Sequence, residues 1–312
     1  MRSETALCGI INVYKEAGYT SNDAVARLRG ILRMRKIGHT GTLDPQAVGV
    51  LPVCLGPATR ICSMLTDEDK EYECICRLGV TTDTLDMTGT IMTQVPAEEV
   101  LQKVSPEMLV RTAGRFTGTY EQLPPMYSAV KIGGKKLYEY ARRGETVERL
   151  TRSVTIYELE ISDISLPVFK MLIRCSKGTY IRSLCSDIGE ALGTGAAMES
   201  LTRTRAGRFG IGSAVSLDTL ENIMKSDPDK IRDHIMTLDT YFDRYPCVRV
   251  KPEGAKFLIN GNPIRFDNVQ ELSFLNEGED LVRMCDENGR FLALYSTDRS
   301  EELLKPYKMF LS

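Results

Sequence analysis

Hydrophobic and polar residues alternate along several short segments of this chain of 312 residues. In residues 70–80, "KEYECICRLGV", Tyr72 begins a series in which every second side chain is apolar, which is the pattern of a half-buried strand. Residues 169–175 alternate in the same way, and residues 8–14 and 152–161 are rich in β-branched and aromatic side chains. These four segments are therefore predicted to be strands.

A helical period appears in two other segments. Aliphatic residues recur three or four positions apart in residues 22–36, and Ser21 precedes them as the expected N-cap. Residues 181–193 form a second expected helix, which ends at Gly193. Because strands and helices interleave irregularly, we expect an α+β fold with a mixed, mostly antiparallel sheet and flanking helices.

The pattern changes near residue 245. Short strand-like segments follow, and Asn-Gly pairs at 260–261 and 288–289 predict hairpin turns. The sequence therefore predicts a large domain over residues 1–245 and a small C-terminal β-barrel over residues 246–312.

Composition narrows the chemistry. The nine cysteines include no C-x-x-C pair and there are two histidines, so no zinc motif appears, and no cofactor motif is present. Free cysteines are typical of a reducing compartment. No apolar run is long enough for a signal peptide or a membrane span, so we expect a cytoplasmic protein that binds no membrane.

Charge is unevenly distributed, although the formal net charge is −2. Residues 27–36, 170–182 and 203–208 carry lysines and arginines but no acid, which predicts a basic face for a polyanion. Ordinary solvated surfaces would give the same pattern. Residues 124–150 mix basic residues with tyrosines around Gly133 and Gly134, which suits an RNA-binding arm or an ordinary surface hairpin and helix.

Asp44 stands out in the loop "KIGHTGTLDPQAVGVLP", residues 36–52. Followed by Pro45, it fits a helix N-cap. A phosphate-binding loop is excluded because no lysine follows Gly41 at the required spacing. The remaining hypothesis is that Asp44 is a catalytic carboxylate. These residues alone do not decide between a helix cap and a catalytic group.

The wider pattern resembles the TruB family of tRNA pseudouridine synthases, in its stand-alone bacterial form. The resemblance rests on Gly-Thr-Leu-Asp-Pro and the residues that follow it, and on four later blocks: "KEYECICRLGVTTDTLDMTG", "QLPPMYSAVKIGGKKLYEYAR", "CSKGTYIRSLCSDIGEALG" and "LTRTRAGRF". An earlier segment, "KEAGYTS" (residues 15–21), departs from the family pattern, because it has Glu16 where the family usually has proline. That change removes a rigid φ angle from the turn after the first strand.

The resemblance implies that the protein isomerises uridine to pseudouridine at position 55 in the T-arm of tRNA, without a cofactor. It implies a catalytic Asp44, Arg182 as its ion-pair partner, and Tyr72 stacked on the flipped base. Residues implied to bind the substrate are His39, Tyr180, Leu201 and Lys15. It also implies a PUA-like RNA-binding domain at the C-terminus and action without a guide RNA, and we expect a monomer.

Chemistry supports these roles. Burial would raise the pKa of Asp44 and favour the neutral acid, so a nearby cation is needed to keep it ionised. The carboxylate could attack C1′ of the sugar or C6 of the base, or assist a glycal route, and the sequence does not choose. The alternative function is a non-catalytic RNA-binding protein or tRNA-folding chaperone with the same fold. Such a protein would not need Asp44, Tyr72 and Arg182 together.

Overall fold

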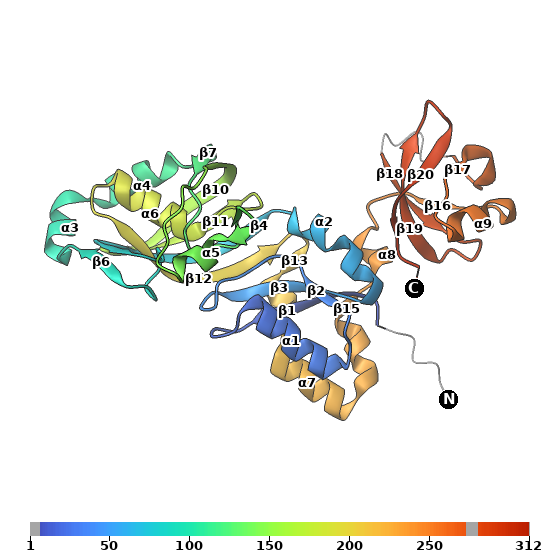
Figure 1. The fold of residues 1–312 in the computed structure, drawn as a ribbon, viewed down its shortest axis with the longest axis horizontal. Coiled ribbons are helices and arrows are strands. Elements are labelled where there is room, and N and C mark those ends of the chain that lie inside the picture. The colour runs from blue at the N-terminus through green and yellow to red at the C-terminus, as the bar shows by residue number, and fades with distance from the viewer. Residues whose placement is uncertain (1–6, 273–279, 312) are drawn as a thin grey trace.

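The computed structural model describes residues 7–272 and 280–311, which form two large sheets of eleven and five strands, two two-stranded sheets, and helices around them. Figure 1 shows the larger sheet extending across the molecule and the C-terminal sheet at one end. The expected α+β class with a small, curled C-terminal sheet is confirmed.

The large sheet has the order β14-β1-β3-β12-β4-β11-β10-β7. Its strands are β14 (Val215–Ser216), β1 (Gly9–Lys15), β3 (Val48–Leu55), β12 (Ala196–Ala206), β4 (Lys70–Leu78), β11 (Val168–Cys175), β10 (Arg152–Ser165) and β7 (Gly118–Gln122). The short strands β2 (Ile37–His39), β13 (Phe209–Gly210) and β15 (Ile235–Met236) pair beside this path. Pairs β1–β14 and β3–β12 are parallel and the other pairs are antiparallel. The four segments that the sequence predicts as strands are confirmed as β1, β4, β10 and β11.

Two helices cover different parts of this sheet. Helix α6 (Ile181–Ala191) packs Leu184 and Ile188 against the buried side chains of β4 and β11, in one apolar cluster. Helix α1 (Ser21–Leu32) packs Leu28 on β1 and β3, together with α7 (Leu217–Ser226). Fully burying a leucine stabilises the fold by about 1.5–3 kcal/mol, so these faces fix both helices on the sheet.

The cap of α1 differs from the prediction. Thr20, not Ser21, is the N-cap: the Asp23 amide donates to the Thr20 hydroxyl (3.1 Å), and the Thr20 amide donates to the Asp23 carboxylate (2.9 Å). This reciprocal capping box satisfies two amides that a helix end leaves free. The Ser21 hydroxyl is thereby free to accept from the Leu43 amide (2.9 Å).

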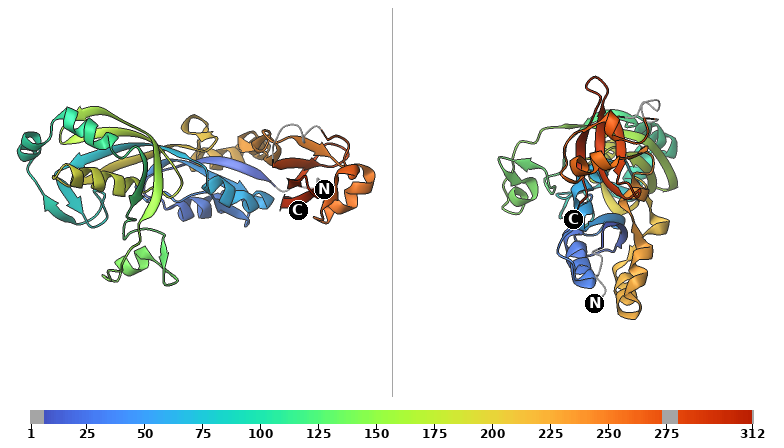
Figure 2. Two further views of the ribbon diagram at one scale, coloured as in Figure 1. Left: turned by 90° about the horizontal axis from the view of Figure 1, so that it is seen from above. Right: turned by 90° about the vertical axis from the view of Figure 1, so that its right-hand side faces the viewer.

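Two insertions leave the large sheet. The first contains β5 (Val80–Thr82), β6 (Ile91–Gln94), α3 (Ala97–Lys103) and α4 (Pro106–Gly114). The second is the arm, with β8 (Lys131–Ile132), β9 (Lys135–Lys136) and α5 (Leu137–Ala141), which projects away from the body in Figure 2. The arm has the hairpin and short helix that its sequence suggested. The remaining short helices are η1 (Gly56–Ile61), α2 (Cys62–Thr66), η2 (Ile211–Ser213), η3 (Pro228–His234) and α8 (Leu238–Tyr241).

The C-terminal sheet has the order β16-β18-β19-β20-β17. These strands are β16 (Cys247–Arg249), β18 (Leu281–Cys285), β19 (Phe291–Asp298), β20 (Leu303–Met309) and β17 (Ile264–Arg265), with η4 (Phe266–Asn268) beside them. The predicted hairpin at 288–289 joins β18 to β19 and is confirmed. The hairpin predicted at 260–261 is wrong, because α9 (Pro252–Ile259) ends there and Gly261 follows it with φ of 66°. Pro252 at the first helical position was the missed signal.

An aromatic seam joins the two sheets. Phe242, just after α8, lies with its ring centroid 6.1 Å from that of Phe291 and 6.0 Å from that of Phe310. These rings belong to one buried cluster with Val50 of β3 and Leu294 of β19. The predicted domain boundary after residue 245 falls between α8 and β16, while the core runs continuously across it.

Candidate active site

Asp44 does not cap a helix, so that alternative is wrong. The Ala47 amide donates to the Asp44 carbonyl (3.1 Å) in a tight turn, and the chain enters β3 at Val48. Gly49 explains the strand: its φ is 104°, and a Cβ there would lie 2.3 Å from the Arg203 carbonyl oxygen of β12. The close, parallel approach of β3 to β12 therefore replaces the helix that Asp44 and Pro45 suggest.

Buried polar groups hold the Asp44 turn from one side. The Lys15 ammonium donates to the carbonyls of Tyr19 (2.6 Å) and Pro45 (3.0 Å), and the Gly18 amide donates to Pro45 (2.9 Å). Lys15 is completely buried, and this burial lowers its pKa to about 8. The structure therefore places Lys15 beneath the turn as a brace. Glu16, the departure from the family pattern, contributes a carbonyl that also accepts from Lys15 (3.0 Å).

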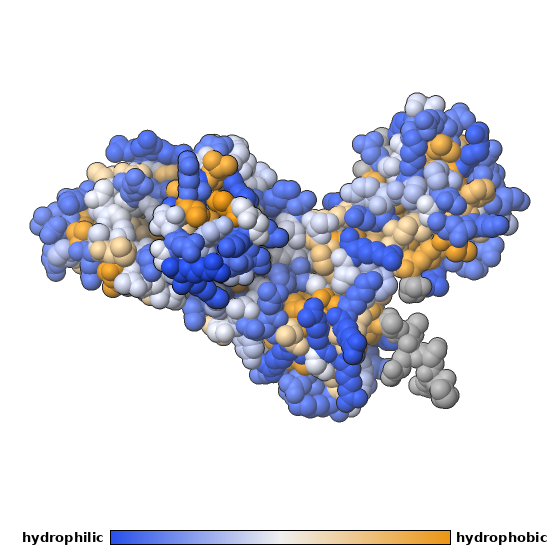
Figure 3. All heavy atoms as spheres, in the orientation of Figure 1, coloured by the Kyte–Doolittle hydropathy of each residue, from blue (hydrophilic) through white to orange (hydrophobic). Residues whose placement is uncertain are grey.

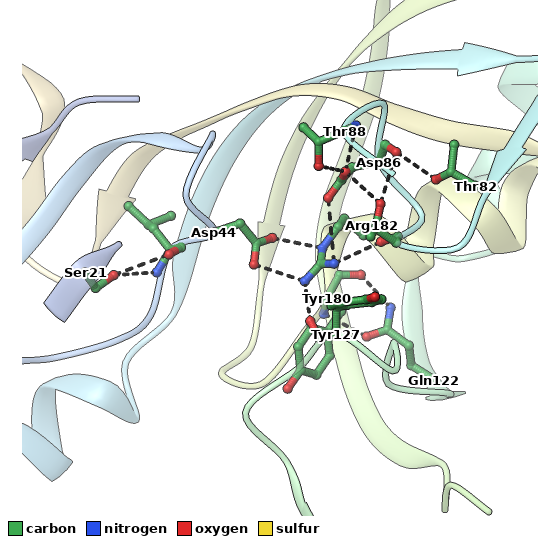
Figure 4. Close-up of polar contacts among 11 residues, drawn as sticks. Ser21, Asp44, Thr82, Asp86, Thr88, Gln122, Tyr127, Tyr180 and Arg182 are labelled. Atoms are coloured by element: carbon green, nitrogen blue, oxygen red, sulfur yellow. Dashed lines mark hydrogen bonds and ion pairs between the residues drawn. The ribbon is translucent and has the colours of Figure 1, made fainter. Parts of the chain in front are cut away.

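Asp44 and Arg182 form a bidentate ion pair (Figure 4). Arg182 Nε lies 2.9 Å from Asp44 Oδ2, and its Nη2 donates to Oδ1 at 3.0 Å. The Arg182 side chain is 6% exposed, whereas the Asp44 side chain is 34% exposed, so the carboxylate keeps a face open to a substrate. Burial raises the pKa of Asp44, the Arg182 charge opposes that rise, and the nearby Asp86 adds to it.

Asp86 is a member of this site that the sequence reasoning missed. Arg182 Nη1 donates to the Thr84 carbonyl (2.9 Å) and lies 3.7 Å from Asp86 Oδ2. The other Asp86 oxygen accepts from the hydroxyl of Thr84 (2.9 Å) and from the amide of Thr88 (3.0 Å). Asp86 lies in the segment "TTDTLDMTG" of one family block, and the approach of this segment to Arg182 depends on tertiary structure.

A third loop completes the surroundings of Arg182. Its Nη2 also donates to the Tyr127 carbonyl (2.8 Å), at the start of the arm. Every guanidinium nitrogen thus has an acceptor, which is what a buried arginine requires. Three loops, carrying Asp44, Asp86 and Tyr127, converge on the first turn of α6.

Three apolar or aromatic residues of the predicted site lie around this pair. Leu201 of β12 is buried in the cluster that contains Leu43, next to Asp44, and Tyr72 packs against that cluster. Burial raises the pKa of Tyr72, and burial likewise raises that of Tyr180, so both phenols stay neutral near pH 7. Tyr180 immediately precedes α6 and appears beside Arg182 in Figure 4.

His39 lies apart from the ion pair, at the end of β2. The Gly41 amide donates to its Nδ1 at 3.4 Å. Burial lowers the pKa of His39, and the Arg203 charge also lowers it, so the imidazole is neutral at pH 7. A neutral ring at this position can stack or accept a hydrogen bond, and it adds no charge to the site.

Arg203 is a buried cation that the sequence had suggested as part of a basic surface. Its side chain is almost fully buried, and its Nε donates to the Val50 carbonyl (2.7 Å). This contact ties β12 to β3 beside the Asp44 turn. Alternation along β12 would place Arg203 on the same face as Leu201, which was the available signal.

Most of the other basic residues in two of the predicted segments are neutralised by acids on neighbouring elements. The ion pairs are Lys170–Glu73 (2.9 Å), Arg174–Glu158 (3.0 Å), Lys177–Asp67 (2.9 Å), Arg205–Glu71 (3.1 Å) and Arg208–Asp243 (2.9 Å). Segments 170–182 and 203–208 therefore do not form the acid-free face that their sequences predict.

The arm keeps its charges available. Its exposed or half-exposed cations include Lys131, Lys135, Lys136, Arg142 and Arg143, and no salt bridge involves these five within residues 7–272 and 280–311. Lys136 and Arg142 lie over the Tyr138 ring, 5.4 and 5.3 Å from its centroid. Figure 3 shows strongly hydrophilic side chains gathered over this part of the molecule. The arm thus combines cations for phosphates with aromatic rings for bases.

No three His, Cys, Asp or Glu side chains lie together as metal ligands would in the part of the chain that the structure describes. Likewise, over residues 7–272 and 280–311, none of the helices has the length and apolar character needed to cross a bilayer.

Two solved structures are similar to almost the whole of this chain. A Cbf5-Nop10-Gar1 complex contains a chain that is 27% identical, with a TM-score of 0.68, covering 97% of this chain and 85% of its own. An H/ACA RNP bound to a substrate RNA containing 2′-deoxyuridine gives a TM-score of 0.67 at 26% identity, with the same coverage.

Two family models and many named relatives match the sequence of this chain. Residues 29–181 match the model of the TruB family pseudouridylate synthase N-terminal domain, and residues 182–243 match the tRNA pseudouridylate synthase B C-terminal domain. Relatives named tRNA pseudouridine synthase B come from Lachnoclostridium phytofermentans (45% identity, 97% of this chain and 99% of the relative), Bacillus pumilus (39%, 96% and 97%) and Pseudomonas aeruginosa (37%, 94% and 93%). The chain therefore belongs to the TruB family of pseudouridine synthases, as its sequence motifs indicated.

Proposed function

We propose that this enzyme converts uridine to pseudouridine in tRNA, at position 55 of the T-arm, and that Asp44 is its catalytic carboxylate. The relatives named above support tRNA as the substrate. The observation that carries the catalytic assignment is the bidentate contact of Asp44 with buried Arg182, at 2.9 and 3.0 Å, on a carboxylate that stays partly exposed.

The reaction moves one bond and gains or loses no atoms. The N1–C1′ bond of uridine breaks, the uracil rotates, and C5 bonds to C1′. C5 then loses its proton and N1 takes up a proton, so the product is an isomer of uridine. An ionised Asp44 can attack C1′ or C6 or assist a glycal route, and it stays close enough for proton transfer. Arg182 offsets the burial that would otherwise protonate this carboxylate near neutral pH.

The uridine must leave its stack to reach Asp44, at a cost of a few kcal/mol. We propose that Tyr72 stacks on the flipped uracil and that Tyr180 and Leu201 line the rest of its site, since they lie around the ion pair or in the apolar cluster beside it. His39 would contact the RNA near the vacated stack, and Lys15 would support the Asp44 turn from below. The side chains of Tyr72, Tyr180 and Leu201 would keep water away from the reactive sugar.

RNA recognition is proposed to rest on the arm and on the C-terminal part. The unpaired cations and tyrosines of residues 124–150 suit phosphates and unstacked bases. Residues 246–312 would form a PUA-like RNA-binding domain beside a catalytic domain of residues 1–245. We further propose that the enzyme works as a cytoplasmic monomer without a guide RNA.

The test measures tritium release from a tRNA transcript made with 5-tritiated uridine. Native enzyme should release one equivalent per tRNA, Asp44→Asn should release none above background, and the exposed Asp229→Asn should match the native enzyme. A transcript with cytidine at position 55 should release nothing. Background release from both the native and Asp44→Asn chains would leave only the RNA-binding alternative. Native-level release by Asp44→Asn would refute the catalytic role of Asp44, and release from the cytidine transcript would refute the position.

A further inference from the structure

Gln122 is a buried polar residue beside the site that the proposed mechanism does not use. It ends β7, where the chain leaves the large sheet toward the arm, and it is 1% exposed. We propose that Gln122 is a positioning residue for the Asp44–Arg182 pair, acting through the peptide groups of Tyr180. This inference rests on the proposed function of that pair.

The side-chain amide of Gln122 forms hydrogen bonds with both the backbone amide and the backbone carbonyl of Tyr180. The Tyr180 amide donates to Gln122 Oε1 (2.8 Å), and Gln122 Nε2 donates to the Tyr180 carbonyl (3.0 Å), as Figure 4 shows. A single hydrogen bond would let Tyr180 pivot, whereas two opposed bonds fix both the position and the orientation of its backbone. Gln122 thus acts as a one-residue extension of the sheet toward α6.

Tyr180 is the residue at which the chain enters α6. Its backbone is extended, with φ of −100° and ψ of 109°, and it is an N-cap without a side-chain capping bond. Its carbonyl also accepts the first helical hydrogen bond, from the Leu184 amide (3.1 Å). In the absence of a side-chain cap, the two hydrogen bonds from Gln122 define where the first turn of the helix begins.

Arg182 lies in that first turn, two residues after Tyr180. Its two contacts with Asp44 require the guanidinium plane to face the carboxylate edge-on, because bidentate pairing fixes both distance and orientation. A shift of the first turn would move the Arg182 backbone and break this alignment. The adjacent Ser183 hydroxyl donates to the Leu123 carbonyl (2.8 Å), so β7 and its exit hold the same turn at a second point.

Gln122 is itself held in place by Tyr120 and, through Tyr120, by Asp187. Its Nε2 also donates to the Tyr120 hydroxyl (2.5 Å), and that hydroxyl donates to Asp187 Oδ2 (3.3 Å). Asp187 belongs to α6, so the contacts form a closed loop that joins two turns of one helix through β7. A residue that only filled space in the core would not need this set of donors and acceptors.

The experiment compares Gln122→Met with Gln94→Met. The first keeps side-chain volume and removes both bonds to Tyr180, and the second makes the same chemical change at an exposed position of β6. For Gln122→Met we expect kcat to fall between about 10- and 100-fold, because small displacements of catalytic groups cost that much, while tRNA affinity stays within about twofold. Gln94→Met should leave kcat, affinity and the pH profile unchanged.

The pH profile of kcat separates positioning from a structural role. Asp44 faces Arg182, Asp86 and Lys15, and a poorly placed Arg182 would lower its pKa less. The acidic side of the pH–kcat profile (its acid limb) should therefore lie at higher pH for Gln122→Met than for the native enzyme. Gln122→Asn, whose shorter amide cannot span both Tyr180 groups, should shift the limb in the same direction and serves if the methionine variant does not fold.

Three outcomes decide the inference. A fall in kcat with the limb shifted upward supports it. A kcat within twofold of the native value, or a fall in kcat that only tracks lost folded protein and leaves the limb in place, overturns it. Failure of the proposed function is distinct, since it would appear as full activity of Asp44→Asn, whatever the Gln122 variants do.

Discussion

Arg182 links two carboxylates of unequal role. It meets Asp44 with two short contacts and Asp86 with one longer contact of 3.7 Å, while Thr84 and Thr88 satisfy Asp86 independently. Asp86 is therefore held in place without Arg182, whereas the two side-chain hydrogen bonds of Asp44 in the described structure both come from Arg182. The charge balance of the site depends on this arginine.

Replacing Arg182 with methionine should remove that balance. Burial and the Asp86 charge would then raise the pKa of Asp44 against only the weaker effect of Lys15, so its ionised fraction would fall at a higher pH than in the native enzyme. We expect kcat to drop at least about 100-fold at pH 7 and to recover partly as pH rises, which a pH–rate profile measures. A methionine variant whose acid limb coincides with the native one would contradict this account.

Sequence reasoning reached some of these residues and not others. Asp44 and Arg182 came from the family motifs, since no local pattern pairs positions 138 residues apart. Asp86 and Gln122 were missed because their roles depend on loops that meet α6 only in the folded chain. Ser21 was assigned to the wrong task because Thr20 and Ser21 are equally good caps, and the Asp23 position decides between them.

At the level of elements, alternation predicted β4 and β11 well because each of them buries one face more than the other. The helix that Asp44 and Pro45 suggested failed because the following residues pair with β12 as strand β3. The hairpin expected at 260–261 failed because α9, which starts at Pro252, occupies the preceding residues. Charge patterns failed for a related reason. Acids on β4 and β10 face the cations of β11, so a segment without acids in sequence is neutral in space.

The cations of the arm and the ion-paired cations of residues 170–177 are therefore expected to contribute differently to RNA binding. Replacing Lys131, Lys135 and Lys136 with alanine should weaken tRNA binding and lower the slope of log affinity against log salt by roughly one unit per lost phosphate contact. The matched control replaces Lys170, Arg174 and Lys177, which are ion-paired. Titrations of labelled tRNA at several salt concentrations measure both slopes. Equal effects of the two triple variants would refute the assignment of the arm as the main electrostatic contact.

At the scale of the molecule, the aromatic seam makes the two sheets mechanically dependent. Phe242 contacts Phe291 and Phe310, and the Arg60 guanidinium donates to the Met309 carbonyl (2.5 Å) across the same boundary. The sequence predicted two domains from a change in pattern, and it could not show the seam, because the contacts join segments far apart in the chain.

Phe242→Ala should destabilise both parts together, by about 3–5 kcal/mol, since it leaves a cavity in a core that both share. Denaturant unfolding, followed by circular dichroism and by a probe in the C-terminal sheet, should show both transitions moving to lower denaturant. The control is Phe257→Ala, whose ring is 46% exposed and should matter little. A C-terminal transition unaffected by Phe242→Ala would show that the parts fold independently.

The contacts of Arg182 with the Thr84 and Tyr127 carbonyls use main-chain oxygens, which remain whatever side chain either position carries. Scanning mutagenesis of those two positions would therefore report only on their side chains, such as the Thr84 hydroxyl that bonds to Asp86, and would hide this main-chain link to the reacting carboxylate. Insertions, deletions or prolines that re-route either loop would expose that link, so tolerance to changes in loop length, rather than in residue type, is the sensitive measure at these places.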